Sequence, residues 1–187
     1  MANSRNRPAT YADLYDVPEN QVGEIIGGEL FASPRPAVRH ANVATLLGAM
    51  LIGPYRRGIG GPGGWVLLYE PELHFRDDVL VPELAGWRRE RLADLPGNAA
   101  AVEVVPDWIC ELLSPSTARL DRARKLPIYA RERAGHAWLI DPAAQTLEVM
   151  RLEGERWTLI GTFAGDAQVR AEPFDAIELD LATLWTL

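Results

Sequence analysis

Apolar residues along the chain switch between the period of a helix and the period of a strand. In residues 43–51 they fall at i, i+3, i+4, i+7 and i+8, which predicts an amphipathic helix that ends by Pro54. The runs 65–69, 72–75 and 79–85 have the composition of strands, with apolar and polar residues alternating in the second run. The helix should therefore cover one face of a sheet to which these strands belong.

The run 108–113 is apolar on both faces, as expected for a central strand that helices cover. A polar stretch at 96–98 precedes it. The segment 114–117, Ser-Pro-Ser-Thr, then stops the strand and can cap a basic helix, which should run towards Gly135 with a kink at Pro127. This helix returns the chain to a further strand.

The two ends of the chain complete the predicted fold. Near the start, Thr10 can cap a short helix, and residues 24–31 have the pattern of a hairpin that turns at Gly27-Gly28. Three later strand segments predict a C-terminal antiparallel meander: 136–140, 146–152 and 156–163. We therefore predict an α/β fold with a mixed central sheet flanked by helices. With 187 residues, the chain should form one domain over 1–187, because domains commonly hold roughly 100 to 200 residues.

The composition excludes several classes of protein. Hydrophobic residues make up 48% and charged residues 24%, which is ordinary for a globular chain. No apolar run reaches the roughly 20 residues needed to cross a bilayer, and residues 1–10 lack the apolar centre of a secretory signal, so we expect a cytoplasmic protein. Cys110 is the only cysteine, which rules out an intrachain disulfide and a zinc site of several thiolates. Any metal would need oxygen or histidine ligands.

The net charge of -7 argues against a protein that coats nucleic acid non-specifically, since that mode depends on many Lys and Arg contacts to phosphate. The predicted helix after residue 117 is nevertheless basic. Its Arg119, Arg122 and Arg124 are candidates for contacts with a nucleic-acid backbone. A solvated helix face with no partner explains these charges at least as well.

Lys125 is the only lysine among 19 basic residues. In a chain that otherwise uses arginine, one retained lysine suggests a site that needs a compact ammonium on a flexible stem, which a planar guanidinium does not replace. Chance is the competing explanation. A surface ion pair with Asp121, four residues earlier on the helix, is the simplest structural role.

Glu111 is the most informative acidic residue. Alternation places it with Ile109 and Leu113 on one face of an apolar strand, near the end where the strand exits. Burying an unpaired carboxylate costs several kcal/mol, so a metal, a cation or strong donors should lie beside it. Sites gather at the carboxyl ends of strands in open α/β sheets, which favours a metal or catalytic role over a structural ion pair with an arginine.

Glu83 follows Pro82 within the segment 79–85. A proline cannot donate to a ladder, so this strand should be bulged or at an edge, and bulges often aim a side chain at a site. If Glu83 and Glu111 converge, they could hold Mg²⁺ or Mn²⁺ through oxygen ligands. His40 begins the first long helix near Glu29, and these two residues are second-tier candidates for the same cleft.

The residues discussed above, with others between them, resemble those of a known family. The segments are Glu24-Ile25-Ile26-Gly27-Gly28-Glu29-Leu30, Ser33-Pro34, His40, Val81-Pro82-Glu83, Glu111-Leu112-Leu113-Ser114-Pro115-Ser116, Asp121, Lys125, Tyr129 and Trp138-Leu139-Ile140-Asp141-Pro142. Their order and spacing are similar to those of the bacterial Uma-two family of restriction endonucleases, which belongs to the PD-(D/E)XK nuclease superfamily.

The resemblance implies a restriction-endonuclease-like fold and a divalent-metal phosphodiesterase site, carried here by Glu83, Glu111 and Lys125. It further implies DNA as the substrate and a homodimer. The sequence departs from the family pattern in two places. Glu83 stands where the family usually has aspartate, and Leu113 stands where a lysine is expected two residues after the strand carboxylate, a role that the resemblance moves to Lys125.

Two main hypotheses follow for the function. The first is a Mg²⁺- or Mn²⁺-dependent endonuclease that hydrolyses DNA, with Glu83 and Glu111 as metal ligands, the Leu112 carbonyl as a further ligand and Lys125 positioning the attacking water. The second is a nuclease fold without chemistry that acts in nucleic-acid binding or assembly. Cleavage of RNA or of a small nucleotide diester is a further alternative.

Overall fold

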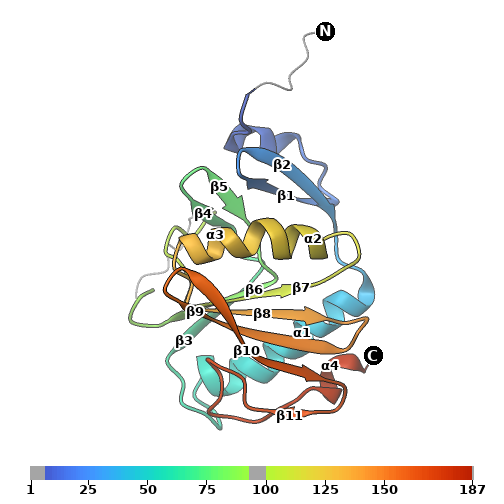
Figure 1. Ribbon diagram of the computed structural model, residues 1–187, viewed down its shortest axis with the longest axis vertical. Helices are drawn as coiled ribbons and strands as arrows, with labels where there is room; N and C mark the ends of the chain where they lie inside the picture. The colour runs from blue at the N-terminus through green and yellow to red at the C-terminus, as the bar shows by residue number, and fades with distance from the viewer. Residues whose placement is uncertain (1–6, 93–99, 187) are drawn as a thin grey trace.

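The larger of two main sheets carries the central strands of the molecule. The computed structural model describes residues 7–92 and 100–186 (Figure 1). Six strands form this sheet in the order β10-β9-β8-β7-β6-β3. They are β3 (Trp65–Tyr69), β6 (Leu84–Arg88), β7 (Trp108–Leu112), β8 (His136–Asp141), β9 (Thr146–Glu153) and β10 (Arg156–Ala164). Only β7 and β8 are parallel among these neighbours, so the sheet is mixed, which confirms the predicted class.

A helix connects the parallel strands β7 and β8 and covers one face of the sheet (Figure 1). It consists of α2 (Ala118–Leu120), a wide turn η3 (Asp121–Lys125) and α3 (Leu126–Arg131). A parallel pair needs such a crossover. The wide turn has π-helical hydrogen bonding and comes just before Pro127, which lacks an N–H and crowds the preceding turn. The distortion predicted at Pro127 is therefore present as a widened turn.

The opposite face of the sheet packs on α1 (Val38–Leu51), which continues into the π-helical turn η2 (Ile52–Arg56). The C-terminal segment joins this core through Phe174, whose ring lies 4.6 to 5.6 Å from the rings of Tyr55, Trp65, Trp108 and Trp138. The remaining elements there are β11 (Gln168–Val169), β12 (Leu179–Asp180) and α4 (Ala182–Trp185). This packing explains why the end of the chain is rich in apolar residues.

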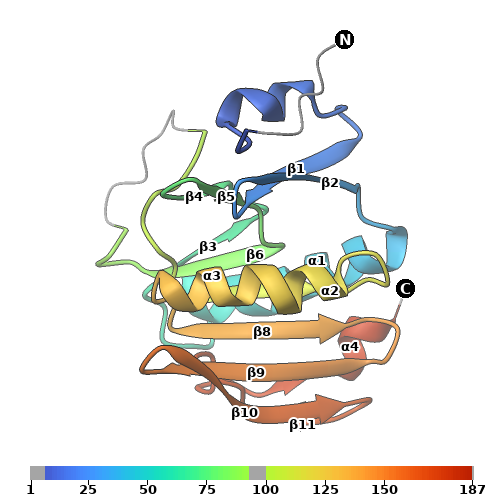
Figure 2. The same ribbon diagram turned by 45° about the horizontal axis from the view of Figure 1, so that its top comes forward.

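A smaller sheet lies above the helix α2–α3 in Figure 2, which shows the strand β8 below it. Its strands follow the order β2-β1-β5-β4. They are β1 (Gln21–Ile26), β2 (Glu29–Pro34), β4 (Leu73–Phe75) and β5 (Asp78–Leu80), and the short helix η1 (Tyr11–Asp16) precedes them. Gly27 and Gly28 turn the predicted hairpin with φ of 62° and 78°, a conformation that favours glycine.

The predicted strand 79–85 is wrong as a continuous element. β5 ends at Leu80 in the smaller sheet and β6 begins at Leu84 in the larger one. Between them, Pro82 has no N–H to donate, and the N–H of Val81 binds the Glu24 carboxylate at 2.8 Å. The chain therefore crosses from one sheet to the other at Val81-Pro82-Glu83.

The polar stretch at 96–98 lies outside the described residues. Within the described ranges, every helix is too short or too polar to span a bilayer.

Candidate functional site

The strand register places Glu83 opposite Glu111. In the antiparallel ladder of β6 and β7, Leu84 pairs with Cys110 and Ala85 pairs with Ile109. Continuing that register by one residue beyond Leu84 brings Glu83 to Glu111. Directly opposed residues of a ladder have their Cβ atoms about 4.5–5.5 Å apart, so the register alone brings the two carboxyl groups together.

The Glu83 side chain, and not a main-chain carbonyl, accepts the Leu112 N–H just beyond the last residue pair of this ladder. Its Oε2 accepts a hydrogen bond from the Leu112 N–H at 3.0 Å, and its Oε1 lies 3.1 Å from His40 Nε2. The same Nε2 donates to the Leu112 carbonyl at 2.8 Å, which requires the proton to be on Nε2 because a carbonyl only accepts. His40 thus links the carboxylate of Glu83 to the main chain at the end of β7.

Glu111 is held by two donors on one oxygen. Its Oε1 accepts from Tyr129 Oη at 2.7 Å and lies 2.9 Å from Lys125 Nζ, so Oε2 takes neither contact. The residue is 1% exposed, and its neighbours Ile109 and Leu113 join the core on the helix-covered face. The predicted buried carboxylate with strong donors beside it is therefore confirmed.

Lys125 is buried, with 2% of its surface exposed, among three carboxyl groups. Its Nζ lies 2.9 Å from both Glu24 Oε1 and Glu111 Oε1, and 3.7 Å from Asp121 Oδ1. A fourth contact joins it to the Val81 carbonyl at 3.4 Å. The pair with Asp121 exists, but it is the longest of these contacts and it is buried, so the surface i, i+4 pair does not describe this lysine.

Burial and charge shift the pKa values of the two facing carboxyls in opposite directions. Burial raises the pKa of Glu111 well above its usual range, although the Lys125 ammonium opposes this. Burial also acts upward on Glu83, but the hydrogen bond with His40, the charge of Lys125 and a hydrogen bond with Glu111 outweigh it, so the pKa of Glu83 is lowered. The pKa values of the two facing carboxyls are therefore shifted in opposite directions, that of Glu83 downward and that of Glu111 upward.

The other charged groups respond to the same surroundings. Burial opposes the charge of Lys125, but Glu111 and Glu24 outweigh it and raise its pKa well above the usual value, so the ammonium persists. Burial raises the pKa of Asp121 to about 6. Burial would lower the pKa of His40, but the Glu83 carboxylate raises it above its usual value. The cavity thus brings the carboxyl groups of Glu24, Glu83, Glu111 and Asp121 close to two basic side chains that are mostly buried, Lys125 and His40.

These groups line a cavity of about 330 Å³ between the two sheets and the helix. Its lining includes Glu24, His40, Glu83, Glu111, Asp121 and Lys125. The loop Ser114–Thr117 and the segment Ser33–Ala37 line it as well, and both contribute polar side chains. The site is thus a concave, charged pocket at the carboxyl end of β7, where ligands gather in α/β sheets.

The oxygen atoms at this point suit a hard divalent cation. His40 Nε2 contacts both a Glu83 oxygen and the Leu112 carbonyl, and Glu111 lines the same cavity as Glu83. Mg²⁺ is commonly bound by one or two carboxylates, while waters and substrate oxygens complete its shell. Across residues 7–92 and 100–186, no group of three or more His, Cys, Asp or Glu side chains is placed to hold a metal ion. The donors fit an ion that keeps water and substrate ligands, and they do not form a cage made by protein side chains alone.

The structure brings most of the predicted site residues together. Glu83, Glu111 and Lys125 converge in the cavity, and His40 joins them. Glu29 does not reach the cavity, because it lies past the hairpin turn on β2, where it is 63% exposed and 3.3 Å from Arg124. The placement of Glu29 in the same cleft is therefore corrected.

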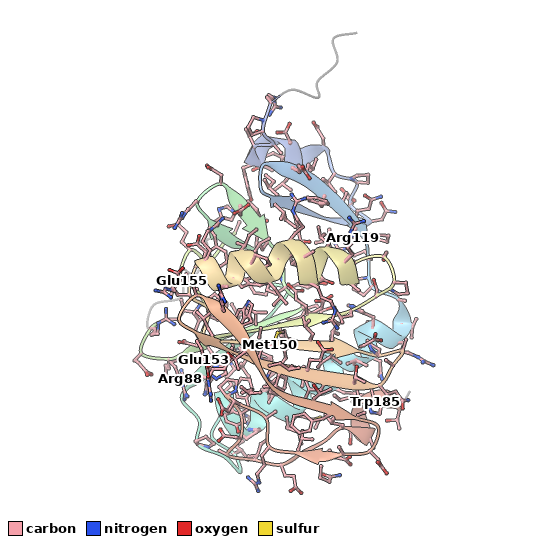
Figure 3. All side chains as sticks on the ribbon, in the orientation of Figure 1. Arg88, Arg119, Met150, Glu153, Glu155 and Trp185 are labelled. Atoms are coloured by element: carbon pink, nitrogen blue, oxygen red, sulfur yellow. The ribbon has the colours of Figure 1, made fainter. Side chains whose placement is uncertain are left out.

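The three candidate phosphate-binding arginines differ in their contacts. Arg122 forms a bidentate pair with Glu148, at 2.7 and 3.1 Å, and Arg124 binds the Ile26 carbonyl at 3.2 Å as well as Glu29. Arg119 is exposed at the α2 end of the helix (Figure 3). The basic helix therefore uses much of its charge within the protein, and Arg119 is the one of the three for which we find no such pairing in the described part of the chain.

Sequence reasoning missed three residues of the site: Glu24, Asp121 as a buried carboxyl, and Tyr129. Glu24 and Tyr129 were recognised only as parts of the family resemblance. A signal for Tyr129 was present, because it lies four residues after Lys125 and so on the same helix face. Glu24 gave no local signal, since its partners are about 57 to 101 residues away along the chain.

Tyr129 offers a test of this network that does not depend on function. Replacing it with phenylalanine removes the donor to Glu111 Oε1 and leaves a buried carboxyl with one partner fewer, so we expect Tyr129→Phe to lower the free energy of unfolding by about 1.5–3 kcal/mol. Urea unfolding followed by circular dichroism measures this change. The matched control is Tyr15→Phe, at a residue that is 79% exposed, where no loss is expected. Equal stability of the two variants would contradict the network.

Comparisons with known proteins agree with this architecture. The sequence profile of the Uma2 (Uma-two) family, described as "Putative restriction endonuclease", matches residues 8–182. The fold is similar to a crystal structure from Anabaena variabilis ATCC 29413, described as a "putative nuclease", with 22% sequence identity and a TM-score of 0.72. That similarity covers 95% of this chain and 98% of the other. No curated protein matches the sequence. The family match over nearly all of the chain shows that this protein is a member of the Uma2 family.

Proposed function

We propose that this protein is a divalent-metal-dependent endonuclease that hydrolyses phosphodiester bonds of DNA. The observation that carries the proposal is the meeting of Glu83 and Glu111, with the only lysine of the chain buried 2.9 Å from Glu111. The family description supports a nuclease activity of this kind. Mg²⁺ or Mn²⁺ would be held by Glu83, Glu111 and the Leu112 carbonyl.

The side chains have distinct roles in this proposal. A divalent cation at this position would lower the pKa of a bound water and stabilise charge on the phosphate under attack. The Leu112 N–H and His40 keep Glu83 in place, and Tyr129 fixes one oxygen of Glu111. An ammonium has three donors, and two of those on Lys125 make short contacts with Glu24 and Glu111.

The third donor of Lys125 defines its proposed task. Its remaining protein contacts, at 3.4 Å to Val81 and 3.7 Å to Asp121, are long. This donor is therefore available to orient a water or to stabilise a phosphoryl oxygen. Arg119, exposed on the same helix, is the first candidate for a contact with the flanking backbone.

A cleavage assay tests the proposal. Purified protein is incubated with supercoiled plasmid, linear duplex DNA, single-stranded DNA, RNA and cyclic dinucleotides, with Mg²⁺ or Mn²⁺ and in parallel with EDTA. We expect DNA cleavage that depends on the metal and is lost in EDTA. Cleavage of RNA or of the dinucleotides alone would redirect the proposal to another phosphodiester, and no cleavage of any substrate would contradict it.

A nuclease fold without chemistry is the second candidate. It is favoured by the net charge of -7 and by Glu83 in the place of the family's aspartate. This alternative predicts no metal binding at the two carboxyls. Calorimetric titration that shows tight Mn²⁺ binding, lost in Glu83→Ala, would exclude it.

His40 should tune the proposed metal site without touching the metal. Replacing it with glutamine weakens the link between Glu83 and the Leu112 carbonyl, and substitutions of groups that orient metal ligands typically cost about 10–100-fold in affinity or activity. We expect His40→Gln to weaken Mn²⁺ binding by about tenfold, measured by calorimetry. His74→Gln, on β4 and outside the cavity, is the control, and equal affinities for the two variants would show that His40 has no such role.

A further inference from the structure

We propose that Glu24 is a positioning residue, a single carboxylate that ties Lys125 to the chain segment carrying Glu83. The contact between Glu24 and Lys125 can be tested whether or not the protein cleaves DNA. Its effect on cleavage rests on the proposed function.

One oxygen of Glu24 makes both contacts. Oε1 lies 2.9 Å from Lys125 Nζ and accepts the Val81 N–H at 2.8 Å. The Val81 carbonyl in turn lies 3.4 Å from Lys125 Nζ, so Glu24, Val81 and Lys125 form a closed set of contacts. Glu24 is 5% exposed, which excludes water as the main partner of its charge.

The contact between Glu24 and Val81 matters for the site because Val81 lies close to Glu83 along the chain. Val81 lies two residues before Glu83, on the crossing between the sheets where neither ladder includes it. Pro82 cannot donate a hydrogen bond, so the Glu24 carboxylate takes over the N–H that would otherwise be unpaired. Glu24 therefore fixes the start of the segment that delivers Glu83 to Glu111.

The lysine needs the same contact for a different reason. Its ammonium sits on a flexible four-carbon stem, and only the two contacts at 2.9 Å hold it closely. Without Glu24, it would keep the short contact with Glu111 and the longer contacts with the Val81 carbonyl and Asp121. Since Glu24 belongs to β1 of the smaller sheet, that sheet would take part in setting the geometry of a site whose other carboxylates come from elsewhere.

The single lysine provides a direct probe of this contact. Lys125 and the N-terminal amine are the only primary amines of the chain, so acylation with acetic anhydride can be followed at Lys125 by peptide mass spectrometry. The protein is used in full length, without added metal, and its fold is checked by circular dichroism. We expect slow acylation of Lys125 in the parent and an increase of at least tenfold in Glu24→Ala.

Two further variants make this experiment decisive. Glu24→Gln keeps an oxygen acceptor for Val81 but removes the charge, so it should fold even if Glu24→Ala does not, and it should increase acylation to a smaller extent. Glu72→Gln is the matched control, because Glu72 joins Tyr11 and His74 beside the same small sheet and lies outside the cavity. Unchanged acylation in both Glu24 variants, or an equal increase in Glu72→Gln, would overturn the proposal.

Cleavage assays distinguish a failure of the positioning role of Glu24 from a failure of the proposed nuclease function. We expect Glu24→Gln to cleave DNA at least tenfold more slowly than the parent, because the charge that holds Lys125 is lost. Its affinity for Mn²⁺ should stay within twofold, because the glutamine oxygen can still accept the Val81 N–H and so keep the segment of Glu83 in place. Parental cleavage in this variant would overturn the positioning role. If the parent itself cleaves nothing, the proposed function fails, and the acylation result still decides whether Glu24 holds Lys125.

Discussion

Replacing Lys125 with methionine is expected to lower the free energy of unfolding by about 3–5 kcal/mol, the cost of removing one partner from a buried ion pair. The reason is the position of its ammonium among Glu24, Glu111 and Asp121, where it is the nearest cation to all three. Methionine fills similar space but leaves these carboxyls uncompensated. The change is measured by urea unfolding at neutral pH.

The same variant should cleave no DNA even at temperatures where it is folded. Lys125→Arg keeps the charge but not the compact ammonium, so it should not restore cleavage. For stability, the control is Arg119→Met, an exposed position on the same helix where a change within about 0.5 kcal/mol is expected. A Lys125→Met protein as stable as this control would show that the lysine does not hold the carboxyls together.

Glu111→Gln should reduce metal-dependent cleavage by more than about 100-fold while leaving the fold intact. The loss should exceed the roughly 10–100-fold range of substitutions beside a metal ligand, because Glu111 is itself one of the proposed ligands. The amide can still accept hydrogen bonds from Tyr129 and Lys125, and its NH₂ can donate to the facing Glu83 carboxylate. Cleavage rates and Mn²⁺ titrations measure the loss, and urea unfolding measures the stability.

The control for this variant is Glu153→Gln, at an exposed glutamate that pairs with Arg151 at the end of β9. It should cleave at the parental rate. If Glu111→Gln cleaves as well as the control, Glu111 is not a metal ligand in the reaction. If Glu111→Gln instead unfolds, the Glu111 carboxyl is needed for stability, and the expectation that a neutral amide satisfies the same donors is wrong.

Local patterns in the sequence predicted most of the fold because they report which face of each element is buried. The apolar run 108–113 indicated a central strand, and its alternation placed Glu111 on a buried face, as the structure confirms. The meander and the crossover helix were predicted for the same reason. Periodicity detects such elements wherever one face of a helix or strand stays buried along its length.

The errors arose where long-range contacts override local pattern. The segment 79–85 has strand composition throughout, but its two halves belong to different sheets, and the Val81 N–H between them binds the Glu24 side chain rather than a main-chain carbonyl of a ladder. Glu29 was expected in the cleft together with His40, as a second-tier candidate. The register pairs Glu29 with Ile26, so Glu29 shares a face of the hairpin with Glu24 but lies next to the turn at Gly27-Gly28. There it meets Arg124 outside the cavity.

The register that pairs Glu83 with Glu111 shows the same limit. Each carboxylate could be identified as a candidate from its own surroundings, but only the ladder of β6 and β7 specifies that they meet. Register depends on the pairing of two strands and is not encoded in either strand alone. The two facing carboxylates and Lys125 were therefore predictable one by one, while the geometry of the site and partners such as Glu24 were not.

The measurement that tests the account most directly is a crystal structure of the protein soaked in Mn²⁺, with anomalous scattering used to locate the ion. The account predicts one ion bound by carboxyl oxygens of both Glu83 and Glu111 and by the Leu112 carbonyl, with Lys125 beside it. An ion bound elsewhere, or no ion at concentrations that support cleavage, would contradict the proposed site.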